Sequence, residues 1–244
     1  MISASRFRWI ARRAAAAAGL VSGAYAAYVA LTWLRYGQPR RGSEDEADPL
    51  LDRFMPDYDV VDRHHARVPA PAQVTLTAAR ELDLFDSPPV RAIFRARELV
   101  LGAARDDRPR PRGMLAETLA LGWVVLAEDP EREVVVGAVT RPWEANVTFR
   151  SVPPDEFREF AEPDYVKIVW TLRADPISTY ESVFRTETRA VATDHHARAR
   201  FRRYWSLLSP GIIAIRGLMV PRLRAAANRR LAERVPDLRV EDWS

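Results

Sequence analysis

The segment "TETRAVATDHHARARFRRYWSLLSPG", residues 186–211, changes from a strand pattern to a helix pattern within a few residues. Its start completes "YESVFRTETRAVA", residues 180–192, which is rich in the β-branched and aromatic residues typical of strands. Thr193 or Asp194 can cap the helix that follows. That helix carries four apolar and aromatic residues at helical spacing: Phe201, Tyr204, Trp205 and Leu208. The segment predicts a last strand that leads into a C-terminal helix, interrupted at 209–211 and resumed from 212 to 234.

Four earlier stretches also have strand composition. They are "LAETLALGWVVLAED" (115–129), "REVVVGAVT" (132–140), "WEANVTFRSV" (143–152) and "YVKIVWTLRA" (165–174). Turn signals such as Asp129-Pro130 and Asp175-Pro176 separate strands. In the last stretch Ile168 and Trp170 share an apolar face, while Lys167 lies on the other. Five successive strands joined by short turns predict an antiparallel sheet with one apolar side.

One strand and two helices are predicted before this sheet. "YDVVDRHHARV", residues 58–68, has strand composition and ends before Pro69, which lacks the N–H that a sheet needs. A short helix is predicted at about 72–82. A second helix is predicted from Asp86-Ser87-Pro88 to Gly102, because a capping side chain and an early proline mark its start. Residues 103–113 predict an exposed loop.

This order of elements resembles the helix-grip fold of the START-like or SRPBCC superfamily, which includes polyketide cyclases and lipid-transfer domains. Two stretches carry the resemblance: "ARVPAPAQVTLTAARELDL", residues 66–84, and the strand-to-helix segment 186–211. The chain is similar to uncharacterised bacterial members of that group. The resemblance implies an α+β fold, with a curved antiparallel sheet wrapped on a long C-terminal helix and an apolar cavity between them. The helix-grip domain is expected at 57–234.

The N-terminus contains an uncharged stretch at 14–34, between Arg13 and Arg35. As a helix it is about 30 Å long, which matches the hydrocarbon core of a bilayer. We interpret it as a single transmembrane helix, with a basic flank at 1–13, a linker at 35–56 and a tail at 235–244. A cleaved signal peptide and a buried soluble helix are the alternatives. The charges on both sides do not determine which side of the membrane the domain occupies.

Charge is distributed unevenly along the chain. The net charge is +7 for residues 1–42, −10 for 43–194 and +9 for 195–234. Basic ends around an acidic middle favour contact with anionic membrane lipid, or pairing within the protein, over a nucleic-acid groove, which needs a continuous basic face. No nucleic acid is therefore expected as a partner, and the sequence indicates no particular protein partner. The chain has no cysteine, which excludes disulfides and thiolate metal sites.

The sequence favours binding of a hydrophobic or amphipathic small molecule, such as a lipid, without catalysis. Aromatic and aliphatic side chains usually line such pockets. Eight residues are predicted to do so: Trp123, Trp143, Ile168, Trp170, Phe184, Phe201, Tyr204 and Trp205.

Motifs for hydrolysis, nucleotide binding or metal binding are missing from the sequence. Adjacent histidines such as His64-His65 point in different directions and make poor chelates, so no metal or other cofactor is expected. Glu117 and His65 are the candidates for an acid or base in a cavity. A cyclase- or dehydrase-like enzyme that uses one of them, and a protein-interaction module with a filled cavity, remain the alternative functions.

Overall fold

The computed structural model describes residues 4–40, 42–104 and 111–234. The predicted tail at 235–244, the first three residues of the basic flank and residues 105–110 of the predicted loop lie outside the described residues. The elements are α1 (Ala4–Arg35), η1 (Glu44–Glu46), α2 (Pro49–Asp52), β1 (Val60–Val68), α3 (Ala72–Arg80), α4 (Pro88–Leu101), α5 (Met114–Ala120), β2 (Val124–Asp129), β3 (Glu133–Thr140), β4 (Phe149–Arg150), α6 (Pro154–Phe157), β5 (Val166–Pro176), β6 (Ser182–Ala192) and α7 (His195–Arg234).

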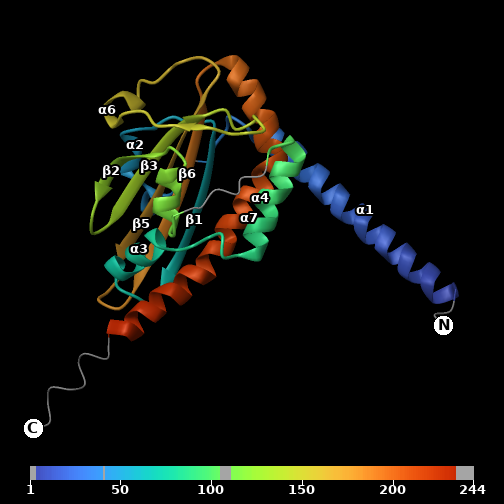
Figure 1. Cartoon of the computed structure of the whole chain (residues 1–244), viewed down its shortest axis with the longest axis horizontal. Helices are drawn as coiled ribbons and strands as arrows, with labels where there is room; N and C mark the ends of the chain where they lie inside the picture. The colour runs from blue at the N-terminus through green and yellow to red at the C-terminus, as the bar shows by residue number, and fades with distance from the viewer. Residues whose placement is uncertain (1–3, 41, 105–110, 235–244) are drawn as a thin grey trace, which may run out of the picture.

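An antiparallel sheet forms the centre of the domain (Figure 1). Its strands lie in the order β1-β6-β5-β3-β2, and the short β4 pairs with β3. The face that carries Phe184 packs against α3, α5 and α7, and we call it the inner face. The face that carries Val169 packs against α2 and α6, and we call it the outer face. Two helical layers thus cover the two sides of one sheet.

The predicted α+β fold, with a curved antiparallel sheet and a long C-terminal helix, is confirmed. The junction between β6 and α7 has the expected helix cap. Oδ1 of Asp194 accepts hydrogen bonds from the backbone N–H groups of His196 and Ala197. The upstream helices also form, and α4 ends at Gly102 in the left-handed conformation that favours glycine.

Two stretches with strand composition are mostly not strands. Residues 114–120 form α5, because Met, Leu, Ala and Glu in this stretch are strong helix formers and Gly113 precedes them with a positive φ. In 143–152 only Phe149 and Arg150 pair with the sheet. Apart from Thr118 in α5, the β-branched residues of these two windows lie in β2 or in irregular segments.

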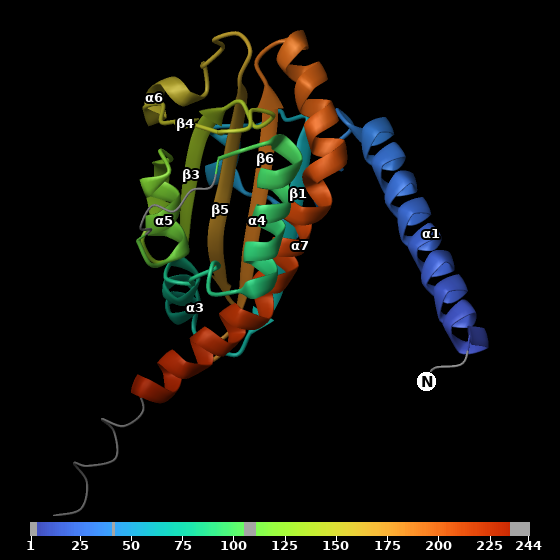
Figure 2. The same ribbon diagram turned by 45° about the vertical axis from the view of Figure 1, so that its right-hand side comes forward.

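The C-terminal helix is not interrupted at 209–211, contrary to the expectation from Pro210. Both Pro210 and Pro221 lie inside the continuous helix α7. Each proline removes one helical hydrogen bond, which costs about 3 kcal/mol in an isolated helix. Burial of Phe201, Met219 and Leu223 against the domain offsets this cost. Figure 2 shows α7 bending toward its C-terminal end, as helices that contain proline commonly do.

Part of the segment predicted as a linker, 35–56, is folded onto the outer face. Asp48 caps α2 by accepting the N–H of Leu51 at 2.8 Å. Leu51 and Met55 are almost fully buried in the outer-face core. Two apolar pairs in the sequence, Leu50-Leu51 and Phe54-Met55, could have predicted this packing. They are hard to recognise because charged residues and prolines surround them.

Helix α1 projects away from the domain at its N-terminal end (Figure 1 and Figure 2). Its C-terminal third lies along α7, where the hydroxyl of Tyr25 donates to the carbonyl of Leu207 at 2.6 Å. The hydroxyls of Tyr28 and Ser209 are 3.0 Å apart. By length and composition two helical stretches, 12–35 and 195–233, could cross a membrane, and a signal sequence or a core helix passes the same test.

Gly122, in the turn between α5 and β2, has a φ of 103°, and a β-carbon added there would collide with the carbonyl oxygen of Phe149. We expect Gly122→Ala to lower the free energy of unfolding by at least about 2 kcal/mol, measured by urea denaturation. Gly102→Ala is the matched control, because Gly102 has a φ of 67° and nothing within 4 Å of the added carbon. Equal losses in the two variants would show that the contact with Phe149 contributes nothing.

Candidate functional site

The eight residues predicted to line a cavity separate into two clusters on the inner face. Trp123, Trp170 and Phe184 belong to the cluster beneath α3 and α5. The other five belong to the cluster between the first turns of α7 and the sheet: Trp143, Ile168, Phe201, Tyr204 and Trp205. The structure therefore does not bring all eight residues to one surface.

In the cluster beneath α3 and α5, rings pack against one another. The centroids of Trp123 and Trp170 are 6.4 Å apart in an edge-to-face arrangement, and those of Trp123 and Phe149 are 5.2 Å apart. Phe184 has no exposed surface. These rings contribute to the core in this conformation.

In the cluster beneath α7, Phe201 is the central ring. Its centroid lies 6.1 Å from Tyr204, 6.0 Å from Trp205 and 6.0 Å from Tyr36. Phe201 is buried, whereas Tyr204 and Trp205 remain half-buried. The hydroxyl of Tyr204 accepts a 3.4 Å hydrogen bond from Nε of Arg97 on α4. This cluster is thus bordered by a charged residue.

A polar group lies between the two clusters and connects α7 to the sheet. Nε of Arg216 on α7 is 3.2 Å from Oδ2 of Asp62 on β1. Nη1 of Arg216 donates to the hydroxyl of Thr186 at 2.7 Å, and Nη2 donates to the hydroxyl of Thr188. Burial lowers the pKa of Arg216, and the nearby Asp62 opposes this effect. His64 completes the group, with Nε2 3.1 Å from Oδ1 of Asp62.

Burial is incomplete at the centre of the inner face. Val166 and Leu172, on the same face of β5, have no exposed surface. Ile168 lies between them on β5 and stays partly exposed, as does Thr188 on the neighbouring β6. Both strands are internal in the sheet, so a sheet edge does not explain this exposure. These two side chains therefore remain partly exposed to solvent, although helices cover the face.

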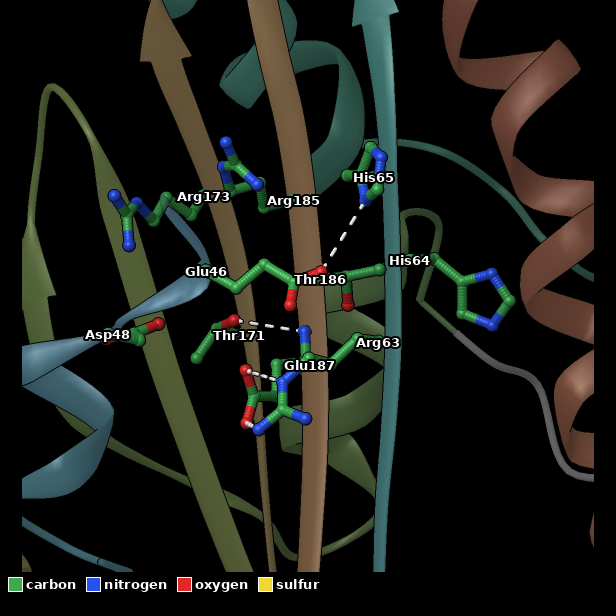
Figure 3. Close-up of a pocket in the computed structure, with 10 residues that line it drawn as sticks. All are labelled: Glu46, Asp48, Arg63, His64, His65, Thr171, Arg173, Arg185, Thr186 and Glu187. Carbon is green, nitrogen blue, oxygen red and sulfur yellow. Dashed lines mark hydrogen bonds and ion pairs between the residues drawn. The ribbon is translucent and has the colours of Figure 1, made fainter. Parts of the chain in front are cut away.

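The two candidate acids and bases are placed elsewhere. Glu117 is buried on α5 and not on a strand. His65 lies on the outer face, with 63% of its side chain exposed, so it cannot act beneath α7. His64 faces the opposite way, as Figure 3 shows.

The outer face has a pocket of about 20 Å³, which has room for about one water molecule. Its lining is charged and includes Glu46, Arg63, His65, Arg173 and Glu187 (Figure 3). Arg63 forms a two-point ion pair with Glu187, with both N–O distances at 2.9 Å. Such a space is too small for a drug-sized ligand.

Charged residues on this face hold the segment 44–55 in place. The buried Arg189 pairs with Glu187 and with Asp52 of α2. Burial lowers the pKa of Arg189, but these two carboxylates outweigh it and leave the pKa raised. Nearby, burial and the adjacent Asp48 raise the pKa of Glu133 to about 9. Within the described residues, no group of three or more His, Asp and Glu side chains could hold a metal ion.

The polar residues of the inner face were not predicted from the sequence. Asp62 and His64 alternate along β1 with Arg63 and His65, so the strand period could have assigned them to one face. Arg216 gives a stronger signal, because it is the single charged residue between Arg203 and Arg222. A lone charge in an apolar helical stretch usually points to a partner within the protein.

Comparisons with known proteins find likeness in solved structures alone, since no protein-family model and no curated protein matches the chain. A norcoclaurine synthase from Thalictrum flavum is 12% identical, with 70% of this chain and 94% of that chain covered and a TM-score of 0.33. A Streptomyces aromatase/cyclase is 14% identical, with 70% and 94% covered and a TM-score of 0.22. The di-domain aromatase/cyclase BexL is 16% identical, with 64% and 44% covered and a TM-score of 0.22.

These are likenesses of fold alone and say nothing about what this chain binds. The strand order and the C-terminal helix described above make it a protein of helix-grip architecture.

Proposed function

We propose that the domain binds a hydrophobic or amphipathic small molecule between the inner face of the sheet and α7, without catalysis. The observation that carries this proposal is the incomplete burial of Ile168 and Thr188 on a face where Val166 and Leu172, on either side of Ile168, are fully buried. Aromatic side chains of both clusters lie on the same face, and the polar group around Arg216 includes Thr188 itself. A ligand there gains about 25 cal/mol for each Å² of apolar surface that it buries.

Mass spectrometry of lipid extracts from the full chain, purified from its source cells, tests the proposal. We expect a reproducible bound hydrophobe in the native protein and much less in Ile168→Trp, because the larger ring fills the centre of the inner face. Ile177→Trp is the matched control, since Ile177 lies in the β5–β6 hairpin with 46% of its surface exposed. A native protein without a hydrophobe, or an equal loss in both variants, would refute the proposal.

The second part of the proposal is that residues 14–34 of α1 tether the domain to a membrane. Leu20, Val21 and Leu34 of this segment are 66–76% exposed, which suits contact with lipid. The arginines at the start of α7 contribute less to lipid contact than their number indicates. Arg198 pairs with Asp59 and Arg200 with Asp164, so Arg203 is the more available of these cations.

Acid–base catalysis is the second candidate function, and the His64–Asp62 pair on the inner face favours it. A histidine oriented by a carboxylate is a common general base. His64→Gln would separate the two functions. If the domain is an enzyme, the native protein converts its bound molecule over time and His64→Gln does not. If it is a carrier, the bound molecule stays unchanged in the native protein and in His64→Gln.

A further inference from the structure

Arg216 is the charged group nearest to the accessible centre of the inner face. All three of its guanidinium nitrogens are directed at the sheet, toward Asp62, Thr186 and Thr188. The two outer nitrogens contact hydroxyl groups, which are neutral acceptors. A guanidinium binds carboxylate or phosphate oxygens more strongly than hydroxyls and through two parallel hydrogen bonds. An anion could therefore replace both threonine hydroxyls as the acceptor.

Asp62 balances Arg216 while no anion is present. Oδ1 of Asp62 lies next to Nε2 of His64, and Oδ2 lies next to Nε of Arg216. The carboxylate is thus held between two potential donors. A second arginine, Arg97, contacts the hydroxyl of Tyr204 and the carbonyl of Pro142, which are both neutral. Tyr204 lies twelve residues before Arg216 on α7, about 18 Å along the helix, so Arg97 does not add to the charge at Arg216. An anion is favoured there by the exchange of neutral acceptors for a charged one, and not by a local excess of positive charge.

Apolar surface lies next to this charge. Ile168 and Trp170 on β5 and Trp205 on α7 belong to the clusters on either side of Arg216. We infer that the molecule bound at the inner face is an amphipathic anion, with its carboxylate or phosphate head at Arg216 and its apolar tail over Ile168, Trp170 and Trp205. This inference rests on the proposed function and specifies the class of its ligand.

Binding of four probes to the full chain in phosphatidylcholine nanodiscs tests the inference. The probes are palmitate, lysophosphatidate, hexadecanol and hexadecylamine, and empty nanodiscs give the background. We expect one or both anions to bind at least tenfold more tightly than hexadecanol, with hexadecylamine weakest. Preference for palmitate assigns a carboxylate head, and preference for lysophosphatidate assigns a phosphate head.

Two substitutions on opposite sides of the ion pair should have opposite effects. Arg216→Gln is expected to reduce anion binding at least tenfold, to the level of hexadecanol. Asp62→Asn is expected to increase anion binding about threefold or more, because it removes a competing and repelling carboxylate. A merely structural ion pair would instead lower binding of every probe in both variants. Arg224→Gln, at an exposed position on the same helix, is the control.

If Arg216→Gln does not fold, the ratio of anion binding to hexadecanol binding in Asp62→Asn still tests whether the site prefers an anion. Equal binding of palmitate, lysophosphatidate and hexadecanol, or an unchanged ratio in Asp62→Asn, would overturn the inference and leave the proposed function standing. Binding of none of the four probes would overturn both.

Discussion

Arg189→Ala is expected to lower the free energy of unfolding by about 3 kcal/mol, since removal of one partner from a buried ion pair is strongly destabilising. The side chains of Arg189 and Glu187 are only 4% and 8% exposed, and their N–O distance is 2.6 Å. Nη1 of Arg189 also donates to the carbonyl of Met55 at 2.7 Å. The substitution therefore leaves a buried carboxylate and a buried carbonyl without one donor each.

Arg150→Ala is the matched control for this experiment. Arg150 and Glu162 form an ion pair of similar geometry, with an N–O distance of 2.7 Å, but both side chains are about half exposed. Solvent screens exposed pairs, so they contribute little to stability. Urea denaturation of both variants measures the difference, and an Arg189→Ala loss no larger than that of Arg150→Ala would contradict the prediction.

The position of Arg189 also shows what the sequence predicts and what it leaves out. Strand alternation places Glu187 on one face with Arg185 and Arg189, and it predicts an ion pair there. The sequence alone favours a solvated pair. In the structure the segment 48–55 covers the pair and buries it. Alternation is a local property of one strand, whereas burial depends on a distant segment that folds back.

The same limit applies to the candidate site. Periodicity in β5 predicts correctly that Ile168 and Trp170 share one face, because side chains alternate between the two faces of a strand that is paired on both sides. It does not predict that these side chains join separate clusters. Nor does it predict that Arg216, 28 and 30 residues from the two β6 threonines, enters the space between these clusters. Long helices bring such residues to the sheet only through their tertiary position.

The contact between α1 and α7 is expected to break when α1 crosses a bilayer. Tyr25 lies near the middle of the uncharged stretch 14–34, about 16 Å from its start at 1.5 Å per residue. If α1 spanned the membrane with Tyr25 on Leu207, the turn of α7 around Leu207 would enter the hydrocarbon, and Arg202, which contacts Trp33 near the end of the uncharged stretch, would lie at its border. The sheet and α4 contact the same helix and would be drawn toward the membrane with it. We therefore expect α1 to separate from α7 when it spans a membrane.

The two arrangements are close in energy. The docked form has two tyrosine hydroxyl contacts, each contributing about 1 kcal/mol, and Arg202 lies 4.2 Å over the ring of Trp33. Insertion of the modestly apolar stretch is favourable by only a few kcal/mol. The availability of a bilayer, more than the strength of either contact, should determine which form dominates.

A crosslinking experiment measures this choice directly, because the chain has no native cysteine. Tyr25→Cys with Leu207→Cys should be joined efficiently by a short bis-maleimide in detergent-free aqueous protein, since both positions are 45–48% exposed. We expect the yield to fall at least fivefold after reconstitution into vesicles that retain the protein at alkaline pH. A control pair in the hydrogen-bonded β5–β6 hairpin, Ile177→Cys with Tyr180→Cys, should keep its yield. An unchanged yield for the first pair in such vesicles would show that α1 stays docked, and the region of α7 around Leu207 would then have to lie at the membrane with it.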